Sequence, residues 1–170
     1  IIDSKTATAK EASTLASKEA AEKSAYKSHF SVTLPILKDT GVEVEESIFF
    51  EPLIPQPPSP PFSSSIFRFD IPLPLGIILS QEEDCSIIKI DEAPPSSPLK
   101  TGDILRCCSA TQTQMSTPTW QLILGGIGQP KTVRFMYSCD GKRSSFEEVM
   151  EAIKSNRMDV GGRDVVIVVE

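Results

Sequence analysis

Residues 93–105, with the sequence APPSSPLKTGDIL, decide how the second half of the chain folds. A Ser-Pro pair leads through Leu99 to Gly102-Asp103, and a glycine suits a backbone position with positive φ. The apolar residues 104–109 that follow are predicted to form a strand. The stretch therefore indicates a connection that leads into a strand of a small packed domain.

Short strands separated by turns are predicted on both sides of this stretch. Each is marked by alternating or continuous apolar residues. The predicted strands span residues 66–71, 75–79, 86–90, 104–109, 132–138 and 165–169. The last of them is expected to pair with the strand at 132–138 or to extend the sheet of a partner.

Two helices are predicted in the same half. The first covers residues 118–124, after a capping Ser116 or Thr117 and with a proline in its first position. The second follows the serine pair 144–145, which offers a capping residue with glutamates placed for a capping box. Its apolar residues recur at helical spacing and are expected to pack it on the sheet: Phe146, Val149, Met150 and Ile153.

Residues 66–138 resemble a PDZ domain. The sequence Pro74-Leu75-Gly76-Ile77 is similar to the carboxylate-binding loop of that family, and residues 93–105 are similar to its Leu-x-x-Gly-Asp-x-Ile stretch. The order of predicted elements also agrees. The resemblance implies an α+β fold, a PDZ-like partly open β-barrel or sandwich with short helices, and residues 139–170 would pack on it as an added helix and strand.

The resemblance also implies a peptide groove between the strand at 75–79 and the helix at 118–124, where a partner segment adds a strand to the sheet edge. Pro74 replaces the first loop glycine and has no N–H, which weakens the capture of a terminal carboxylate. Two interpretations stay open: a groove that reads apolar tails, and a vestigial groove on a plain docking block. The predicted groove residues are Leu75, Gly76, Ile77, Ile78, Leu79, Thr119 and Ile123.

A polar helix at residues 1–28 and a proline-rich arm at residues 29–65 precede this domain. The helical stretch 5–28 has only Leu15 and Tyr26 as large apolar residues, so it can bury little surface. Six prolines within residues 52–61 favour extended polyproline II geometry. The arm is expected to dock on a partner through apolar anchors: Phe30, Leu34, Ile36, Leu37, Ile48, Phe49, Phe50, Leu53, Ile54 and Phe62.

Composition and charge argue against several classes of protein. The net charge of −6 comes without a cluster of lysine and arginine, so no nucleic-acid partner is expected. The four cysteines lack C-x-x-C spacing, which favours reduced thiols and no metal site. No apolar run approaches the roughly 20 residues of a membrane span. The acidic stretch 39–51 is expected to be a solvated linker.

His29 is the only histidine, and no nucleophile or phosphate-binding motif accompanies it, so the chain is not expected to be an enzyme. No intrinsic cofactor is expected, and a peripheral chlorophyll contact through His29 is the one pigment interaction considered. The sequence begins with Ile1, which fits either a removed targeting peptide or a portion of a longer product.

The polar helix, the arm and the domain together favour a non-catalytic linker subunit that fastens neighbouring subunits of a large, membrane-associated complex. This layout resembles the accessory subunits of algal photosystem–antenna supercomplexes. The resemblance implies attachment of light-harvesting antenna proteins to photosystem I, on the stromal side of the thylakoid membrane in the chloroplast. The alternative is a PDZ module that binds peptides and regulates a protease or an assembly factor.

Overall fold

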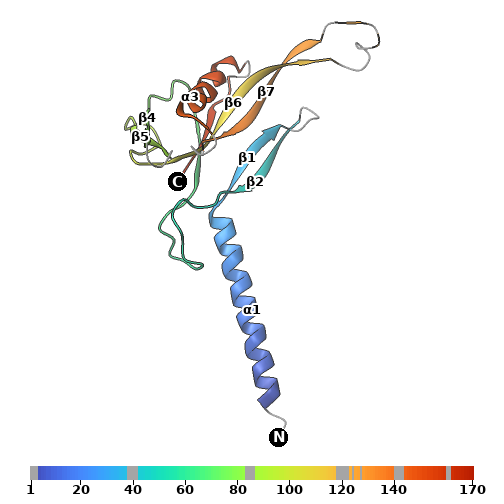
Figure 1. The fold of residues 1–170 in the computed structure, drawn as a ribbon, viewed down its shortest axis with the longest axis vertical. Coiled ribbons are helices and arrows are strands. Elements are labelled where there is room, and N and C mark those ends of the chain that lie inside the picture. Colours follow the sequence, from blue (N-terminus) through green and yellow to red (C-terminus); the bar gives the residue numbers. More distant parts are fainter. Residues whose placement is uncertain are drawn as a thin grey trace. The chain divides into compact units, whose positions relative to one another are not determined.

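The computed structural model describes residues 4–37, 42–82, 87–117, 123, 125–126, 128–139, 144–159 and 162–170. The chain forms two compact units, residues 1–32 with 47–66 and residues 33–46 with 67–170. Helices and strands are mixed in the described residues, which confirms the α+β prediction at that level. The sheets that these residues form do not close into a barrel (Figure 1).

The first unit opens with a polar helix, α1 (Ser4–His29), which covers the helix predicted at 5–28. Between residues 17 and 28 only Glu22 and Tyr26 are partly buried, and the other side chains are exposed. Alanine-rich composition favours the helical backbone here, because alanine has the highest intrinsic helix propensity. The end of the helix is fixed by packing, since Phe30 directly after it is completely buried.

A cluster of aromatic rings holds the proline-rich segment against the end of α1 within this unit. The ring of Phe62 lies 5.5 Å from that of Phe30, 5.8 Å from that of Tyr26 and 4.5 Å from that of His29. The Gln56 side chain closes a loop by accepting a hydrogen bond from the Ser63 N–H at 2.7 Å. The segment therefore folds back on its own unit instead of extending along its whole length.

The sequence predicts an extended arm over residues 29–65, but part of it forms a hairpin. β1 (Ser31–Leu37) and β2 (Glu43–Phe49) make a two-stranded sheet, and residues 33–46 of it belong to the second unit. There Arg68 lies 3.5 Å from Glu45, and Arg163 forms an ion pair with Glu43. Both glutamates are exposed, as the prediction of a solvated stretch expects, but they lie in a strand and pair with arginines distant in the sequence.

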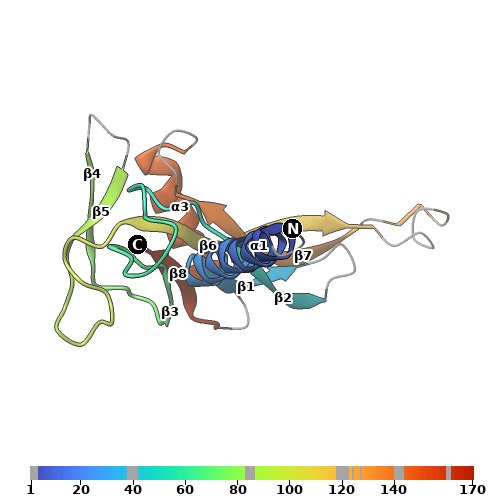
Figure 2. The ribbon, with the colours of Figure 1, turned by 90° about the horizontal axis from the view of Figure 1, so that it is seen from below.

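The second unit is built on a four-stranded sheet with the strand order β3-β8-β6-β7, and β4 and β5 form a separate two-stranded sheet. Figures 1 and 2 show β4 and β5 at the end of the unit opposite the far end of the β6–β7 hairpin. The elements are β3 (Phe67–Ile71), β4 (Ile78–Glu82), β5 (Ile87–Glu92), β6 (Leu105–Ser116), β7 (Gln129–Ser138), α3 (Phe146–Ser155), the 3-10 helix η1 (Asn156–Met158) and β8 (Val165–Val169).

β8 is a central strand, and its predicted pairing with the strand at 132–138 is wrong. It pairs with β3 on one side and with β6 on the other, while β7 pairs with β6. Every residue from Val165 to Val169 is 2% exposed or less. A continuous apolar run of this length suits a strand that is covered on both faces.

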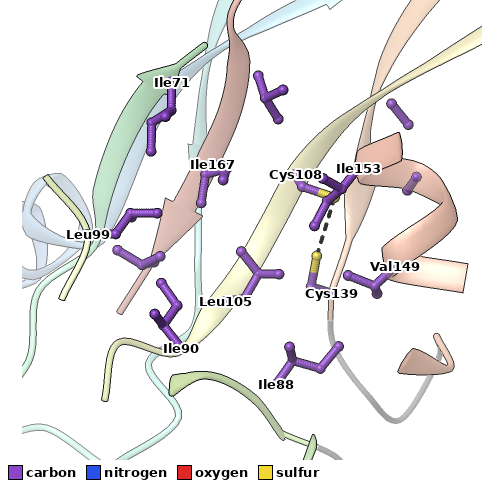
Figure 3. Packing of buried hydrophobic residues seen from close by; sticks show 14 residues of the cluster. Ile71, Ile88, Ile90, Leu99, Leu105, Cys108, Cys139, Val149, Ile153 and Ile167 are labelled. Carbon is purple, nitrogen blue, oxygen red and sulfur yellow. Dashed lines mark hydrogen bonds between the residues drawn. The ribbon is translucent and has the colours of Figure 1, made fainter. Parts of the chain in front are cut away.

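Each face of the sheet has its own cover. On one face Val149 and Ile153 of α3 pack in a core cluster with Cys108 and Ile167 (Figure 3). Val168 points to the other face, because successive residues of a strand alternate. Arg68 is its cross-strand partner and donates to the Thr33 carbonyl at 2.7 Å. The part of the hairpin around Thr33 therefore lies over this second face.

Candidate functional site

An apolar pocket of about 210 Å³ lies in the second unit between the loop before β4, β4 itself and α3. The loop contributes one wall and the exposed side of α3 contributes the other. Two cationic side chains stand among otherwise apolar or backbone surfaces, and no carboxylate is among the lining residues that the structure describes. The lining residues are Leu73, Pro74, Leu75, Gly76, Ile77, Leu79, Met150, Ile153, Lys154 and Arg157.

The loop takes its shape from two residues with special backbones. Gly76 has φ of 65°, in the left-handed region that favours glycine. A Cβ added there would meet the nearest atom, Pro94 Cγ, at an ordinary contact distance of 3.6 Å, so backbone conformation rather than space requires the glycine. Pro74 offers no N–H to a ligand. The apolar side chains of Leu75 and Ile77 remain to line the pocket.

The start of α3 is fixed by the capping box that the sequence predicts. The Ser145 side chain accepts a hydrogen bond from the Glu148 N–H, and the Glu148 carboxylate accepts one from the Ser145 N–H. These bonds from Ser145 hold the pKa of Glu148 below its usual value. The box places Val149 and Ile153 toward the core and leaves Met150 beside the pocket.

The other end of α3 is fixed by a buried side chain, Asn156. Its Oδ1 accepts a hydrogen bond from Ser109 Oγ at 2.9 Å, and its Nδ2 donates to the Ser109 carbonyl at 2.6 Å. The same Nδ2 lies 3.1 Å from the Ala152 carbonyl and 3.0 Å from that of Ile153. Asn156 thus ties the last turn of the helix to β6, and this holds the α3 wall of the pocket in place.

β4 presents a backbone edge beside this pocket. Within the described residues, β4 pairs with β5 alone. The unpaired edge of a strand exposes N–H and C=O groups that another segment can join. Along β4, Leu79 lines the pocket while Ile78 is 53% exposed and is not among its lining residues. An extended segment on this edge could place alternate side chains into the pocket.

The structure brings together four of the predicted groove residues: Leu75, Gly76, Ile77 and Leu79 line the pocket. The predicted groove helix at 118–124 lies outside the described residues apart from residue 123, so it stays a prediction, and α3 forms the second wall of this pocket. Ile123 is 80% exposed and does not line this pocket, and Thr119 lies outside the described residues. The lining residues that were not predicted for the groove include Leu73 in the loop, Met150, Ile153 and Lys154 on α3, and Arg157 after it. The capping box and helical spacing located α3, but Met150 and Ile153 were predicted only as core residues.

The three cysteine thiols that the structure describes show no feature of a reactive or metal-binding site. Cys108 and Cys139 are buried with their sulfur atoms 3.6 Å apart (Figure 3). Burial raises the pKa of Cys107 to about 12, and the hydrogen bond with Cys108 and burial raise that of Cys139. No metal-binding group was found among the residues that the structure describes, and Cys85 is outside them.

His29 lies in the first unit and contacts two serines. Its Nε2 is 2.8 Å from Ser65 Oγ and 3.1 Å from the Ser64 carbonyl oxygen. Any pigment contact through His29 would have to use its other ring nitrogen or displace these contacts. The predicted chlorophyll contact stays a prediction.

The predicted arm anchors divide into internal and exposed groups. Phe30 and Leu34 are completely buried in the chain itself, so they are not available to a partner. Phe62 packs on the aromatic cluster of the first unit. Phe49, Leu53 and Ile54 are exposed, Ile36, Ile48 and Phe50 are half-buried, and the Leu37 side chain lies outside the described part of the structure.

Comparisons with known proteins identify no relative. No family model, no curated protein and no solved structure matches the chain. No helix within the described residues is long and apolar enough to cross a membrane.

Proposed function

We propose that the chain is a docking protein whose second unit binds an extended peptide segment between β4 and α3. The observation that carries this proposal is one juxtaposition: an apolar pocket directly beside a strand edge that no other described strand occupies. Main-chain hydrogen bonds to such an edge supply affinity, and a pocket for alternate side chains supplies specificity.

The order of elements supports a PDZ-like domain that is longer than the predicted one at residues 66–138. The order begins with the strand β3, continues with the loop that contains Gly76, and is followed by the paired strands β4 and β5. β6, β7, α3 and β8 follow, so α3 takes the place of the groove helix and β8 closes the order. On this interpretation the PDZ-like domain runs to the end of β8, and residues 139–170 are an integral part of it.

A matched pair of variants tests the proposed function. Met150 lines the pocket, whereas Met158 is 67% exposed on η1 and does not line it. The Met150→Glu variant is expected to weaken peptide binding by about tenfold or more, because it places a carboxylate in an apolar pocket. The Met158→Glu variant should bind as the native chain does. Equal binding by both variants, measured by fluorescence anisotropy, would show that this pocket is not the docking site.

A role in fastening neighbouring subunits needs a second attachment point, and α1 supplies a candidate. Its side chains from Ser17 to Ser28 are largely exposed, although a polar helix of this kind is marginal alone. Deleting residues 1–28 should then release the chain from its complex while the groove still binds peptides. The placement of that complex in a photosystem–antenna assembly stays a prediction.

A further inference from the structure

We infer that the groove recognises a carboxylate through the side chains of Lys154 and Arg157. Its ligand is then an extended segment in which an apolar residue is followed by an acidic side chain, so that a chain end is not required. The inference rests on the proposed peptide-binding function and names the class of segment that the groove takes.

Two positively charged side chains line the pocket, and none of its described lining residues is negatively charged. Lys154 and Arg157 both line it, and both side chains are exposed. Neither forms an ion pair with another residue in the described part of the chain, and no acidic residue lines the pocket there. Cations beside low-dielectric apolar walls produce a local positive potential that favours an anionic ligand.

The end of α3 does not need these cations to satisfy its backbone. Basic residues near a helix C-terminus commonly interact with the last carbonyl groups. Here the Asn156 backbone N–H bonds the carbonyls of Ile153 and Lys154, and its side chain reaches those of Ala152 and Ile153. Ser155 Oγ adds a 2.6 Å bond to the Ala152 carbonyl. The ammonium and guanidinium groups therefore remain for a ligand.

The loop favours recognition by side chains over recognition by backbone amides. Pro74 stands at its entry and has no N–H, so the loop offers one donor fewer than an all-amide cradle. A cradle of amides suits a terminal carboxylate that sits deep in the loop. Long flexible cations can instead reach a carboxylate on a side chain, so the end of the partner chain is not required.

Four labelled peptides with the common core Ser-Thr-Val-Thr-Leu test this inference. The first ends at the leucine as a free acid, and the second is the same peptide with an amidated end. The third continues with Glu-Gly-Ser and is amidated, and the fourth replaces that glutamate by glutamine. All four share the strand-forming core, and within each pair the two peptides differ only in the presence of the carboxylate.

The third peptide should bind the full chain about tenfold more tightly than the fourth, and the first should exceed the second by a similar factor. Near 1 M salt, where the screening length is about 3 Å, the two affinities within each pair of peptides should become nearly equal. The double variant Lys154→Glu with Arg157→Glu should lose both preferences. A control with the same change in charge, Lys100→Glu with Lys131→Glu, should keep them, since both lysines are exposed and line no part of the pocket.

The outcomes separate the two proposals. If no peptide binds the native chain, the docking function itself is wrong, and the inference is wrong with it. If the first peptide binds but the third binds no better than the fourth, the groove reads chain ends only and this inference is overturned. Should the double variant unfold, the salt dependence of the native chain decides: a glutamate preference that persists at high salt contradicts recognition by the two cations.

Discussion

Replacing Asn156 by alanine tests whether one buried amide sets the position of the groove helix. The side chain is 5% exposed and is the link between the last turn of α3 and Ser109 of β6. The Asn156→Ala variant deletes two hydrogen bonds to Ser109, at 2.9 Å and 2.6 Å, and leaves a small cavity. Each bond contributes about 1 kcal/mol net, and orphaned buried groups add to the loss.

We expect Asn156→Ala to lower the free energy of unfolding by about 2 to 4 kcal/mol, in the range of buried network losses. Urea denaturation followed by circular dichroism measures this loss. The neighbouring Met158→Ala variant, at a side chain that is 67% exposed, should stay within about 0.5 kcal/mol of the native chain. A loss for Asn156→Ala no larger than that of its control would refute the reasoning that this amide anchors α3.

Three further perturbations follow from the same geometry. The Gly76→Ala variant should lose about 1 to 2 kcal/mol of stability by urea titration, because φ of 65° disfavours a Cβ; an unchanged midpoint would mean that the loop relaxes freely. In a Cys85→Ser background, the buried thiols of Cys107, Cys108 and Cys139 should react with a thiol-specific reagent at neutral pH only after urea is added, because burial disfavours the thiolate. Rapid reaction without urea would contradict the packing. The folded state lowers the pKa of Glu148, so the stability from its cap is present above the unfolded pKa of about 4.3 and is lost as pH falls through the lower folded value. The deficit of Glu148→Gln relative to the native chain should therefore shrink on acidification below about pH 4, and a deficit that is independent of pH would rule out the charged cap.

The sequence predicted most elements of the second unit because their signals are local. Alternating apolar residues located β3, and the capping box located the start of α3. The continuous apolar run of β8 identified a strand but not its neighbours, since any covered position in a sheet favours the same run. Its central place between β3 and β6 is a property of topology that no local pattern carries.

The second wall of the groove and the ion pairs of the hairpin could not be predicted, because both depend on contacts between segments that are distant in the sequence. The loop side of the pocket was predicted because the loop carries a recognisable glycine. The α3 side was not predicted, because it depends on which helix packs beside the loop in the folded chain. The acidic stretch seemed unpaired because its partners are remote: Glu43 meets Arg163, which lies 120 residues later in the chain. Such pairs form only after the sheet brings the segments together.

The most direct test of the docking function is amide hydrogen exchange by NMR in the native chain, with and without the free-acid peptide Ser-Thr-Val-Thr-Leu. Strand addition protects backbone N–H groups at the edge that it occupies. Slower exchange at alternate residues of β4, together with shifted signals from Met150 and Ile153 of α3, is the predicted result. Protection confined to other strands, or unchanged exchange along β4 at saturating peptide, would contradict the proposal that a partner docks between β4 and α3.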